Sequence, residues 1–319
     1  APRSYILQNN GKGTFTDITF TVNPDLEYPG MVTDALWTDF DNDNINDLIL
    51  VGEWMKIRTF KNVSGKLVEV YENNGLNDSE GWWNSIEQGD FDKDGDMDYI
   101  VGNFGRNSQL KTSPSEPVTL YTKDFDSNGS LDPILCSYNL GEEFPVFSKD
   151  DMVGQLSGLK GKYLNYSDYA SARITDVFSL EELKGAMVLK AKNFNTSYME
   201  NLGDGKFKIV PLPIETQFSP IYGILNGDFN NDGNEDVVVG GNFFGTRVKF
   251  GRYDANKGLV LCGDGKGNFK PSTVMESGLN IDGEIRDITK LTLADKTEVV
   301  LFVRNNDGIA MYKIESTKK

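Results

Sequence analysis

Four short stretches of the sequence place aspartate or asparagine at alternate positions directly before an apolar run. One of them, GDFDKDGDMDYIVG at residues 89–102, carries five aspartates close together. Like charges at this density repel one another, so the folded chain needs something that offsets the repulsion. Oxygen side chains at positions 1, 3 and 5 of a tight turn are how a chain wraps a hard cation such as Ca²⁺. The repeated pattern therefore predicts a set of calcium-binding loops.

The predicted ligand positions are 1, 3, 5, 7 and 9, counted from the first Asp of each loop. In the first two loops these residues are Asp39, Asp41, Asp43, Ile45 and Asp47, then Asp90, Asp92, Asp94, Asp96 and Asp98. In the last two loops they are Asp124, Asp126, Asn128, Ser130 and Asp132, then Asp228, Asn230, Asp232, Asn234 and Asp236. We expect up to four Ca²⁺ ions, bound less tightly in the last two loops, where asparagine removes one charge.

The loops differ from EF-hands, which begin in the same way. An EF-hand needs a bidentate Glu at position 12 and a helix on each side. Here position 12 is apolar and lies in runs such as LILV and VVV, which are typical of buried strands. The predicted unit is therefore strand, calcium loop and strand, with position 9 closing the site. Solvated Asp-rich turns are the alternative, but four copies with matched spacing favour metal sites.

The composition excludes several classes of function. The net charge is −16, and four Ca²⁺ ions would halve it, so metal sites account for much of the acidity. A chain this acidic is not expected to bind nucleic acid, which favours a basic face. The chain has no histidine, which removes Ser-His and Cys-His catalysis and the usual zinc sites. We predict no catalytic residue; Glu142 and Glu143 are the most conspicuous remaining carboxylates, and a solvated turn is their simpler interpretation.

Location is inferred from the same data. No apolar run approaches the ~18 residues that are needed to cross a bilayer. The chain begins APRSY, without Met or a signal peptide, so a mature or excised segment is expected. Millimolar Ca²⁺ occurs outside the cytosol, which favours a secreted, periplasmic or outer-surface protein. The two cysteines, Cys136 and Cys262, leave open whether a disulfide forms.

A second motif alternates with the aspartate loops. Gly-rich turns between short strands predict β-hairpins at residues 5–19, 59–71, 198–210 and 259–272, and residues 283–303 resemble a copy without ligands. An aspartate-loop hairpin and a Gly-turn hairpin together make a four-stranded blade, which predicts an all-β propeller. About five blades are expected, with six or seven as alternatives. Residues 1–319 would form one domain, closed as a ring by the N- and C-terminal strands.

Residues 148–186 interrupt this pattern and are predicted to be a helical insertion. Ser148 is suited to cap the first helix, and Met152, Val153, Leu156 and Leu159 form an apolar stripe. The simpler interpretation is that this stripe packs on a blade. The functional alternative is a docking element for a partner.

The aspartate loops and the NNGKGTF-type hairpins resemble the FG-GAP/VCBS repeats of integrin-α-like propellers. The stretches FPVFSKDDMVGQL and NFFGTRVKFGRYDANKG, with the opening APRSYILQNNGKGTFTDIT, more narrowly resemble bacterial proteins of the ASPIC/UnbV, CRTAC1-like group. The resemblance covers nearly the whole chain and implies a calcium-binding propeller of the cell surface or the secreted fraction. It says little about activity. Some similar propellers are polysaccharide lyases with a Lys, Arg or Tyr base, so a carbohydrate-active enzyme is the alternative to a binding module.

The predicted ligand-binding face lies opposite the calcium loops. In a blade these loops join strands one and two, so strand two ends on the other face, and the segments that follow it carry arginines and aromatic residues. The predicted ligand-binding residues are Trp54, Arg58, Arg106, Asn107, Arg247, Arg252 and Arg304. Guanidinium groups beside aromatic rings suit an acidic glycan or a peptide carboxylate at the surface of a partner. Alternatively, the arginines pair with acidic neighbours and hold the blades together.

Overall fold

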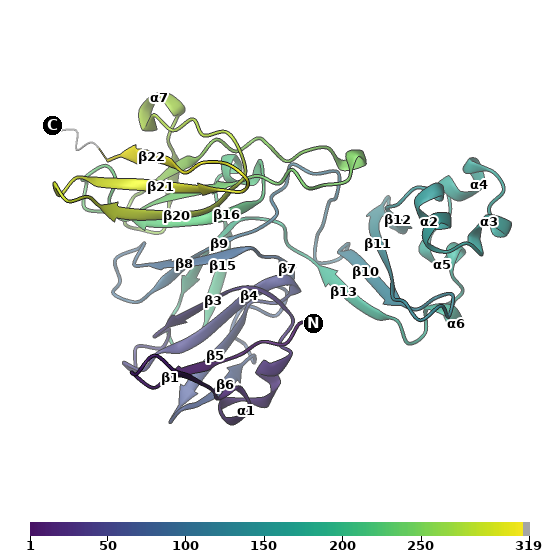
Figure 1. The fold of residues 1–319 in the computed structure, drawn as a ribbon, viewed down its shortest axis with the longest axis horizontal. Coiled ribbons are helices and arrows are strands. Elements are labelled where there is room, and N and C mark those ends of the chain that lie inside the picture. Colours follow the sequence, from purple (N-terminus) through teal and green to yellow (C-terminus); the bar gives the residue numbers. More distant parts are fainter. Residues whose placement is uncertain (315–319) are drawn as a thin grey trace. The chain divides into compact units, whose positions relative to one another are not determined.

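The computed structural model describes residues 1–314 and divides into two compact units. The first unit comprises Ala1–Ser108 and Phe194–Lys319, and the second comprises Gln109–Asn193 (Figure 1). The second unit is therefore an insertion, because the chain leaves the first unit after Ser108 and returns to it at Phe194. This insertion is longer than the predicted helical segment 148–186, since it includes a sheet of its own.

Three antiparallel sheets, one of five strands and two of four, form most of the first unit. Within each sheet the strands are named in the order in which they lie side by side. The first sheet contains β3 (Met31–Thr38), β4 (Asp47–Met55), β5 (Arg58–Val63) and β6 (Lys66–Val70), and β7 (Gly81–Trp82) also pairs with β4. The second contains β8 (Ser85–Gly89), β9 (Asp98–Gly102), β14 (Ser197–Asn201) and β15 (Phe207–Pro211). The third contains β16 (Ile221–Gly227), β17 (Asp236–Gly241), β18 (Leu259–Gly263) and β19 (Phe269–Pro271).

Each of these sheets joins an aspartate-loop hairpin to a Gly-turn hairpin, which is the predicted repeating unit. The aspartate loops connect β3 to β4, β8 to β9 and β16 to β17. The first strands lie side by side from sheet to sheet, with β3 next to β8, β8 next to β16, and β16 next to β20 (Ile285–Thr292). An all-β unit of successive four-stranded antiparallel sheets is consistent with a β-propeller.

The remaining elements of the first unit are smaller. Strand β20 forms a three-stranded sheet with β21 (Glu298–Arg304) and β22 (Ala310–Lys313), and β1 (Leu7–Asn9) pairs with β2 (Phe15–Asp17). The short helices are α1 (Thr19–Val22), α7 (Val274–Ser277) and the 3₁₀ turns η1 (Pro24–Glu27), η2 (Ile214–Gln217) and η3 (Val248–Phe250). Ring closure would need an N-terminal strand to pair with a C-terminal strand. In the described residues β1 pairs with β2 and β22 pairs with β21. Ring closure and the number of blades therefore stay predictions.

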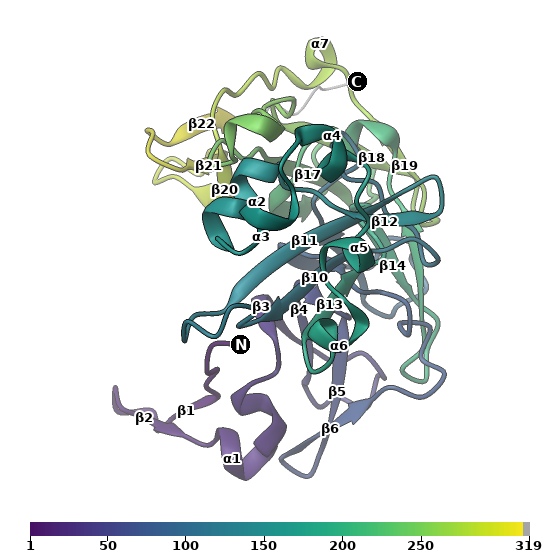
Figure 2. The same ribbon diagram turned by 90° about the vertical axis from the view of Figure 1, so that its right-hand side faces the viewer.

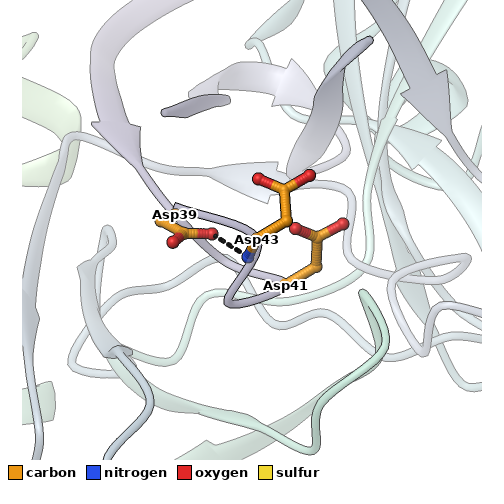
Figure 3. A group of neighbouring side chains, drawn as sticks. All are labelled: Asp39, Asp41 and Asp43. Atoms are coloured by element: carbon orange, nitrogen blue, oxygen red, sulfur yellow. Dashed lines mark hydrogen bonds between the residues drawn. The ribbon is translucent and has the colours of Figure 1, made fainter. Parts of the chain in front are cut away.

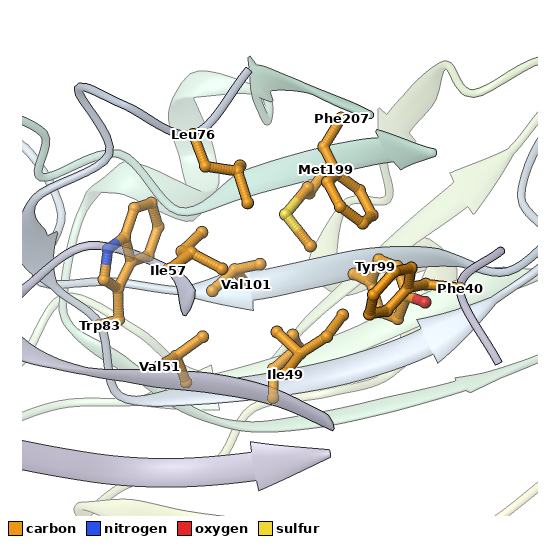
Figure 4. Packing of buried hydrophobic residues seen from close by; sticks show 11 residues of the cluster. Phe40, Ile49, Val51, Ile57, Leu76, Trp83, Tyr99, Val101, Met199 and Phe207 are labelled. Carbon is orange, nitrogen blue, oxygen red and sulfur yellow. The ribbon is translucent and has the colours of Figure 1, made fainter. Parts of the chain in front are cut away.

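An apolar core lies between the first and second sheets. It contains Phe40, Ile49, Val51, Ile57, Leu76, Trp83, Ile86, Tyr99, Val101, Met199 and Phe207 (Figure 4). Residues 47–52 of β4 and all of β9 are buried, which explains why these strands read as continuous apolar runs. The side chains on both faces of these strands are therefore shielded from solvent, and this burial of apolar surface stabilises the packing of one sheet on the next.

The second unit is a four-stranded sheet with short helices. The sheet has the order β12 (Glu142–Pro145), β11 (Asp132–Asn139), β10 (Val118–Lys123) and β13 (Met187–Ala191). The helices are α2 (Lys149–Gln155), α3 (Leu159–Lys162), α4 (Tyr166–Ala170), α5 (Ile174–Val177) and α6 (Leu180–Leu183). The aspartate loop at Asp124 connects β10 to β11, so it and the loop at Asp90 belong to different sheets.

The helices of this unit gather around β11 (Figure 2). Ser148 caps α2 as predicted, in a capping box with Asp151. Met152 and Leu159 pack in one core with Ile134 of β11, so the apolar stripe serves the unit's own core. A docking role for the segment stays a prediction. None of the helices among residues 1–314 combines the length and the apolar character that a membrane crossing requires.

Candidate functional site

The first aspartate loop is held by hydrogen bonds between its own carboxylates and its own backbone. The N–H groups of Asp43 and Asn44 donate to the two carboxylate oxygens of Asp39 at 3.0 and 2.7 Å. Asn42 and Asn44 adopt the left-handed backbone, with φ of 59° and 64°, so that the chain can turn this tightly. The turn brings the carboxylates of Asp39, Asp41 and Asp43 within 4.8 Å of one another (Figure 3).

The third and fourth loops repeat this backbone geometry, and the second shares its tight turn. In the third loop, Asn128 and Gly129 N–H donate to Asp124 at 3.0 and 2.8 Å; in the fourth, Asp232 and Gly233 N–H donate to Asp228 at 3.1 and 2.9 Å. In the second loop, Asp94 and Asp96 N–H donate to Asp92 and Asp94 at 3.2 and 3.1 Å. A turn that points several carboxylates inward, with backbone N–H groups stabilising them, is suited to a cation.

The loops differ in how closely their carboxylates gather. Groups with ligand atoms within 4.8 Å occur at Asp39, Asp41 and Asp43; at Asp90, Asp92 and Asp94; and at Asp124, Asp126 and Asp132. Within residues 1–314 the fourth loop does not form such a group, because position 3 is an amide, Asn230. We therefore expect the fourth loop to bind a cation most weakly.

The aspartate at position 9 connects each loop to its sheet. Its side chain is buried in all four loops. In the three blade-like sheets, one carboxylate oxygen accepts a hydrogen bond from an N–H group of the third strand. These bonds join Asp47 to Asn62 at 2.7 Å, Asp98 to Asn201 at 2.8 Å and Asp236 to Gly263 at 3.0 Å. Position 9 thus ties the aspartate-loop hairpin to the Gly-turn hairpin that follows it in the sheet.

Several carboxylate oxygens in the first two loops are buried without a hydrogen-bond partner. They are Oδ1 of Asp41, Oδ2 of Asp47, Oδ1 of Asp90 and Oδ1 of Asp96. Burial, together with a smaller effect of nearby carboxylates, raises the pKa of Asp47 and of Asp96 to about 6 each. Burial also raises the pKa of Asp98 to about 7. A buried acceptor without a partner is costly, and a bound cation would remove that cost.

Lys61 on β5 reaches into the first loop. Its ammonium group contacts the carboxylate of Asp41 and lies 3.2 Å from a carboxylate oxygen of Asp43. These carboxylates raise the pKa of Lys61, so the group stays charged. The first loop therefore has an internal cation that competes with a metal ion for the same oxygens.

We expect Lys61→Met to increase the calcium affinity of the first loop several-fold. A partly exposed ion pair is worth up to about 1 kcal/mol, and calcium has to displace this one. Isothermal titration with Ca²⁺ measures the effect, and Lys208→Met, which removes a surface pair with Glu200 outside the loops, is the control. Equal or weaker calcium binding by the Lys61 variant would contradict the competition.

An aromatic cluster forms where the second strands of three sheets end. Trp54 lies at the end of β4, Phe104 follows β9, and Tyr253 follows β17. Phe104 lies 5.0 Å from Tyr253, and Trp82 lies 4.9 Å from Trp54 and 4.8 Å from Phe104, between ring centroids in edge-to-face geometry. Phe194 contacts Trp82 and Phe104. Trp54, Trp82 and Phe104 stay partly exposed.

Two of the predicted arginines make local structural contacts. Nε and Nη2 of Arg58 donate hydrogen bonds to the two carboxylate oxygens of Glu69, at 2.6 and 2.7 Å. The Arg304 guanidinium donates to the carbonyl of Gly308 at 2.7 Å and pairs with Asp307 at 2.8 Å. These contacts agree with the alternative that arginines stabilise the blades, and they leave Arg58 and Arg304 less suited to a ligand.

The other predicted residues of this face are exposed. They are Arg106, Asn107, Arg247 and Arg252. The Arg252 guanidinium lies 5.2 Å from the centroid of the Phe244 ring, and the Asn107 side chain donates to the carbonyl of Phe218 at 3.1 Å. That all seven predicted residues converge on one face of the protein stays a prediction.

Sequence reasoning missed three members of the aromatic cluster. Trp82 and Phe194 lie outside the segments that follow the second strands, although the adjacent tryptophans in GWWN (81–84) were a signal. Tyr253 lies within one of these segments, at 241–254, but was not predicted to be a site residue. Glu142 and Glu143 prove to lie on strand β12 and not in a turn. Glu143 accepts a hydrogen bond from the Tyr121 hydroxyl at 2.9 Å and one from the Thr119 hydroxyl, so it stabilises the sheet of the second unit.

Residues 39–101 match the model of a family described as FG-GAP-like repeat. This stretch holds the first two aspartate loops and strands β4 to β8. This part of the chain is similar to an FG-GAP-like repeat. The narrower resemblance to the ASPIC/UnbV, CRTAC1-like group is not confirmed. A search of curated proteins found no match.

Among solved structures, this chain is similar to a lectin from Agrocybe aegerita. That structure is described as the basis of specific recognition of non-reducing terminal N-acetylglucosamine. The match has 14% identity and a TM-score of 0.29, and it covers 98% of this chain and 75% of the lectin chain. So low a TM-score supports no inference about the fold or the ligand of this chain.

Proposed function

We propose that this chain is a calcium-stabilised β-propeller that binds a glycan or protein partner outside the cytosol and does not act as an enzyme. The calcium part of the proposal is supported by the buried oxygens of Asp41, Asp47 and Asp90, which have no hydrogen-bond partner. In a loop that also gathers three carboxylates, such oxygens favour a divalent cation over an empty turn. The extracytoplasmic location follows from the calcium concentration that weak sites of this kind need.

The binding part of the proposal rests on the aromatic cluster. Trp54, Phe104 and Tyr253 come from three different sheets, and Trp82 bridges the first two by edge-to-face contacts. Trp54 has a φ of 60°, an unfavourable backbone for a residue with a large side chain. Partly exposed tryptophans held in fixed orientations are typical of sites that bind ligands by stacking.

The charge of this face selects the ligand class. Arg106 follows Phe104 closely in the chain, and Arg252 precedes Tyr253, so two exposed arginines are near neighbours in sequence of the aromatic cluster. A guanidinium group binds a carboxylate or sulfate through paired hydrogen bonds, and the rings suit the flat face of a sugar. An acidic glycan is the ligand that uses both features. A peptide carboxylate would use the arginines alone.

The carbohydrate-active enzyme is the alternative function. Such an enzyme needs a base, for which an arginine beside a tyrosine is a candidate. Arg286 and Tyr222 form a pair of this kind, with the guanidinium 4.3 Å from the centroid of the tyrosine ring. Burial raises the pKa of Tyr222 to about 12, and the Arg286 charge lowers it by less. A tyrosine base at neutral pH needs a shift in the other direction, so this pair does not favour catalysis.

Replacement of the exposed arginines is expected to weaken binding of acidic glycans. Arg106→Ala and Arg247→Ala should each reduce affinity about tenfold, as expected for loss of a hydrogen bond between charged groups. The probes are heparin, hyaluronan and polygalacturonate, tested on immobilised protein at two salt concentrations. Binding should also weaken with added salt, because exposed charges are screened over about 8 Å at physiological ionic strength.

Arg3→Ala is the matched control, since Arg3 is an exposed arginine near the N-terminus. Glycan binding that is unchanged in both variants, or that is insensitive to salt, would overturn the assignment of this face. Turnover of a glycan, seen as a new reducing end or an unsaturated product, would favour the enzymatic alternative.

A further inference from the structure

The second unit contains a cavity of about 530 Å³ that none of the preceding assignments uses. Its walls come from the β11–β12 hairpin on one side and from α2 and α4 on the other. Four aromatic rings line it, together with small polar side chains. The rings are Phe144, Phe147, Tyr166 and Tyr169. Pockets that bind small molecules have volumes of this order, with mostly apolar walls and a few polar groups.

The cavity has a buried floor and an exposed wall. Tyr169 and Ala172 belong to the apolar core of the unit, and each is less than a tenth exposed. Tyr166, by contrast, is 64% exposed although its ring lines the same cavity. The exposed wall of the cavity therefore presents an aromatic ring to solvent.

The exposed ring of Tyr166 is held in place. Its hydroxyl group donates to the carboxylate of Asp150, with both oxygens at 3.0 Å. The ammonium of Lys149 lies 4.6 Å from the ring centroid and also donates to the carbonyl of Leu164 at 2.9 Å. A fixed ring loses little conformational freedom when a ligand stacks on it, so this arrangement is preorganised for binding.

Three polar side chains of the cavity are uncharged and available to bind a ligand. Among residues 1–314, the side chains of Ser137, Asn139 and Ser171 make no hydrogen bond to the protein, although they line the cavity. In the described part of the chain no carboxylate lines it, and its one cation, Lys149, is already engaged by Leu164 and Tyr166. The lining therefore offers hydroxyl and amide groups to a neutral ligand and no charge to attract an ion.

We propose that this cavity binds a neutral pyranose sugar, as a free saccharide or as the terminal residue of a glycan. The C–H face of a pyranose ring is flat and apolar, which suits stacking on Tyr166, and its hydroxyl groups suit Ser137, Asn139 and Ser171. This site is independent of the face proposed above, because it lies in the other unit and differs in the charge of its ligand.

Saturation-transfer NMR on the full chain tests the proposal. The probes are the methyl pyranosides of glucose, galactose, mannose and N-acetylglucosamine. At least one of them should receive saturation from the wild-type protein, and its affinity should fall about tenfold or more in Tyr166→Ala, a loss in the range of one well-placed aromatic contact. Ala170→Trp, which adds an indole at the cavity wall, should block binding by a second route.

Tyr71→Ala is the matched control, because Tyr71 is 63% exposed and lies outside this unit. It should bind the sugar as the wild type does. Absence of saturation transfer to every neutral probe, or equal binding by Tyr166→Ala, overturns the proposal. Binding of acidic glycans alone, with loss in Arg106→Ala, overturns it too and leaves the proposed function of the other face intact.

Discussion

Chelation of calcium is expected to lower the melting temperature of this protein by about 10 °C or more. A ligand that binds only the folded chain stabilises it by about 2.7 kcal/mol per site when its concentration is a hundred times Kd. In proteins of this size, 1 kcal/mol shifts the melting temperature by about 2–4 °C. Without the ion, each of the first two loops keeps buried carboxylate oxygens that have no partner, such as Oδ1 of Asp41 and Oδ1 of Asp90. Differential scanning fluorimetry in EDTA, followed by excess Ca²⁺, measures the loss and the recovery.

Substitutions locate this effect in the loops. Asp92→Ala removes position 3 of the second loop and should reduce the recovery with Ca²⁺. Asp254→Ala is the control, since Asp254 is an exposed aspartate outside the aspartate loops. An unchanged melting curve in excess chelator, with no metal found by elemental analysis of the purified protein, would show that the loops are solvated turns.

The calcium response is expected to be larger at pH 8 than at pH 5. Burial raises the pKa of Asp98 from 3.8 to about 7, and that of Asp47 and Asp96 to about 6. An acid whose pKa is raised by folding stabilises the folded chain fully below about pH 4, and this contribution is lost as the pH rises through the folded-state pKa. The calcium-free protein should therefore lose stability between pH 5 and 8. Bound Ca²⁺ favours the ionised carboxylates, so it should compensate most at pH 8.

The measurement is the difference in melting temperature with and without Ca²⁺ at the two pH values. Surface ion pairs titrate in the same way with and without the ion, so their contribution to the melting temperature cancels in this difference. Asp98→Asn, which cannot ionise, should flatten the pH dependence of the calcium-free protein. A calcium-free protein that becomes more stable from pH 5 to 8 would contradict the assignment.

Local patterns in the sequence are enough to predict the repeating unit. The spacing of oxygen side chains identifies the four loops, and the apolar runs identify β4, β9 and β17, because both signals lie within about a dozen consecutive residues. The Ser148 cap is local in the same sense. Such features depend on backbone geometry over one turn or one strand, which the residue types there largely determine.

Apart from strand β12, which forms a local hairpin with β11, the features that sequence reasoning missed depend on pairing between distant segments. The chain pairs β9 with β14 and skips the whole of the second unit, so the extent of the insertion could not be read from composition. Lys61 reaches the first loop only because the register of β5 against β4 places it there. Trp82 and Tyr253 meet Phe104 through the packing of three sheets, which no local pattern encodes.

The insertion between β9 and β14 also sets the order in which the protein can fold as it is made. A ribosome adds about 5–20 residues per second, so several seconds separate the emergence of the two strands. During that time β9, whose five residues are all buried in the finished sheet, has β8 on one side and an open edge on the other. An open apolar edge is prone to pair with another chain. Because β10 and β13 pair at the two ends of the second unit, we expect folding of Gln109–Asn193 to bring β14 to β9 without a long flexible loop between them.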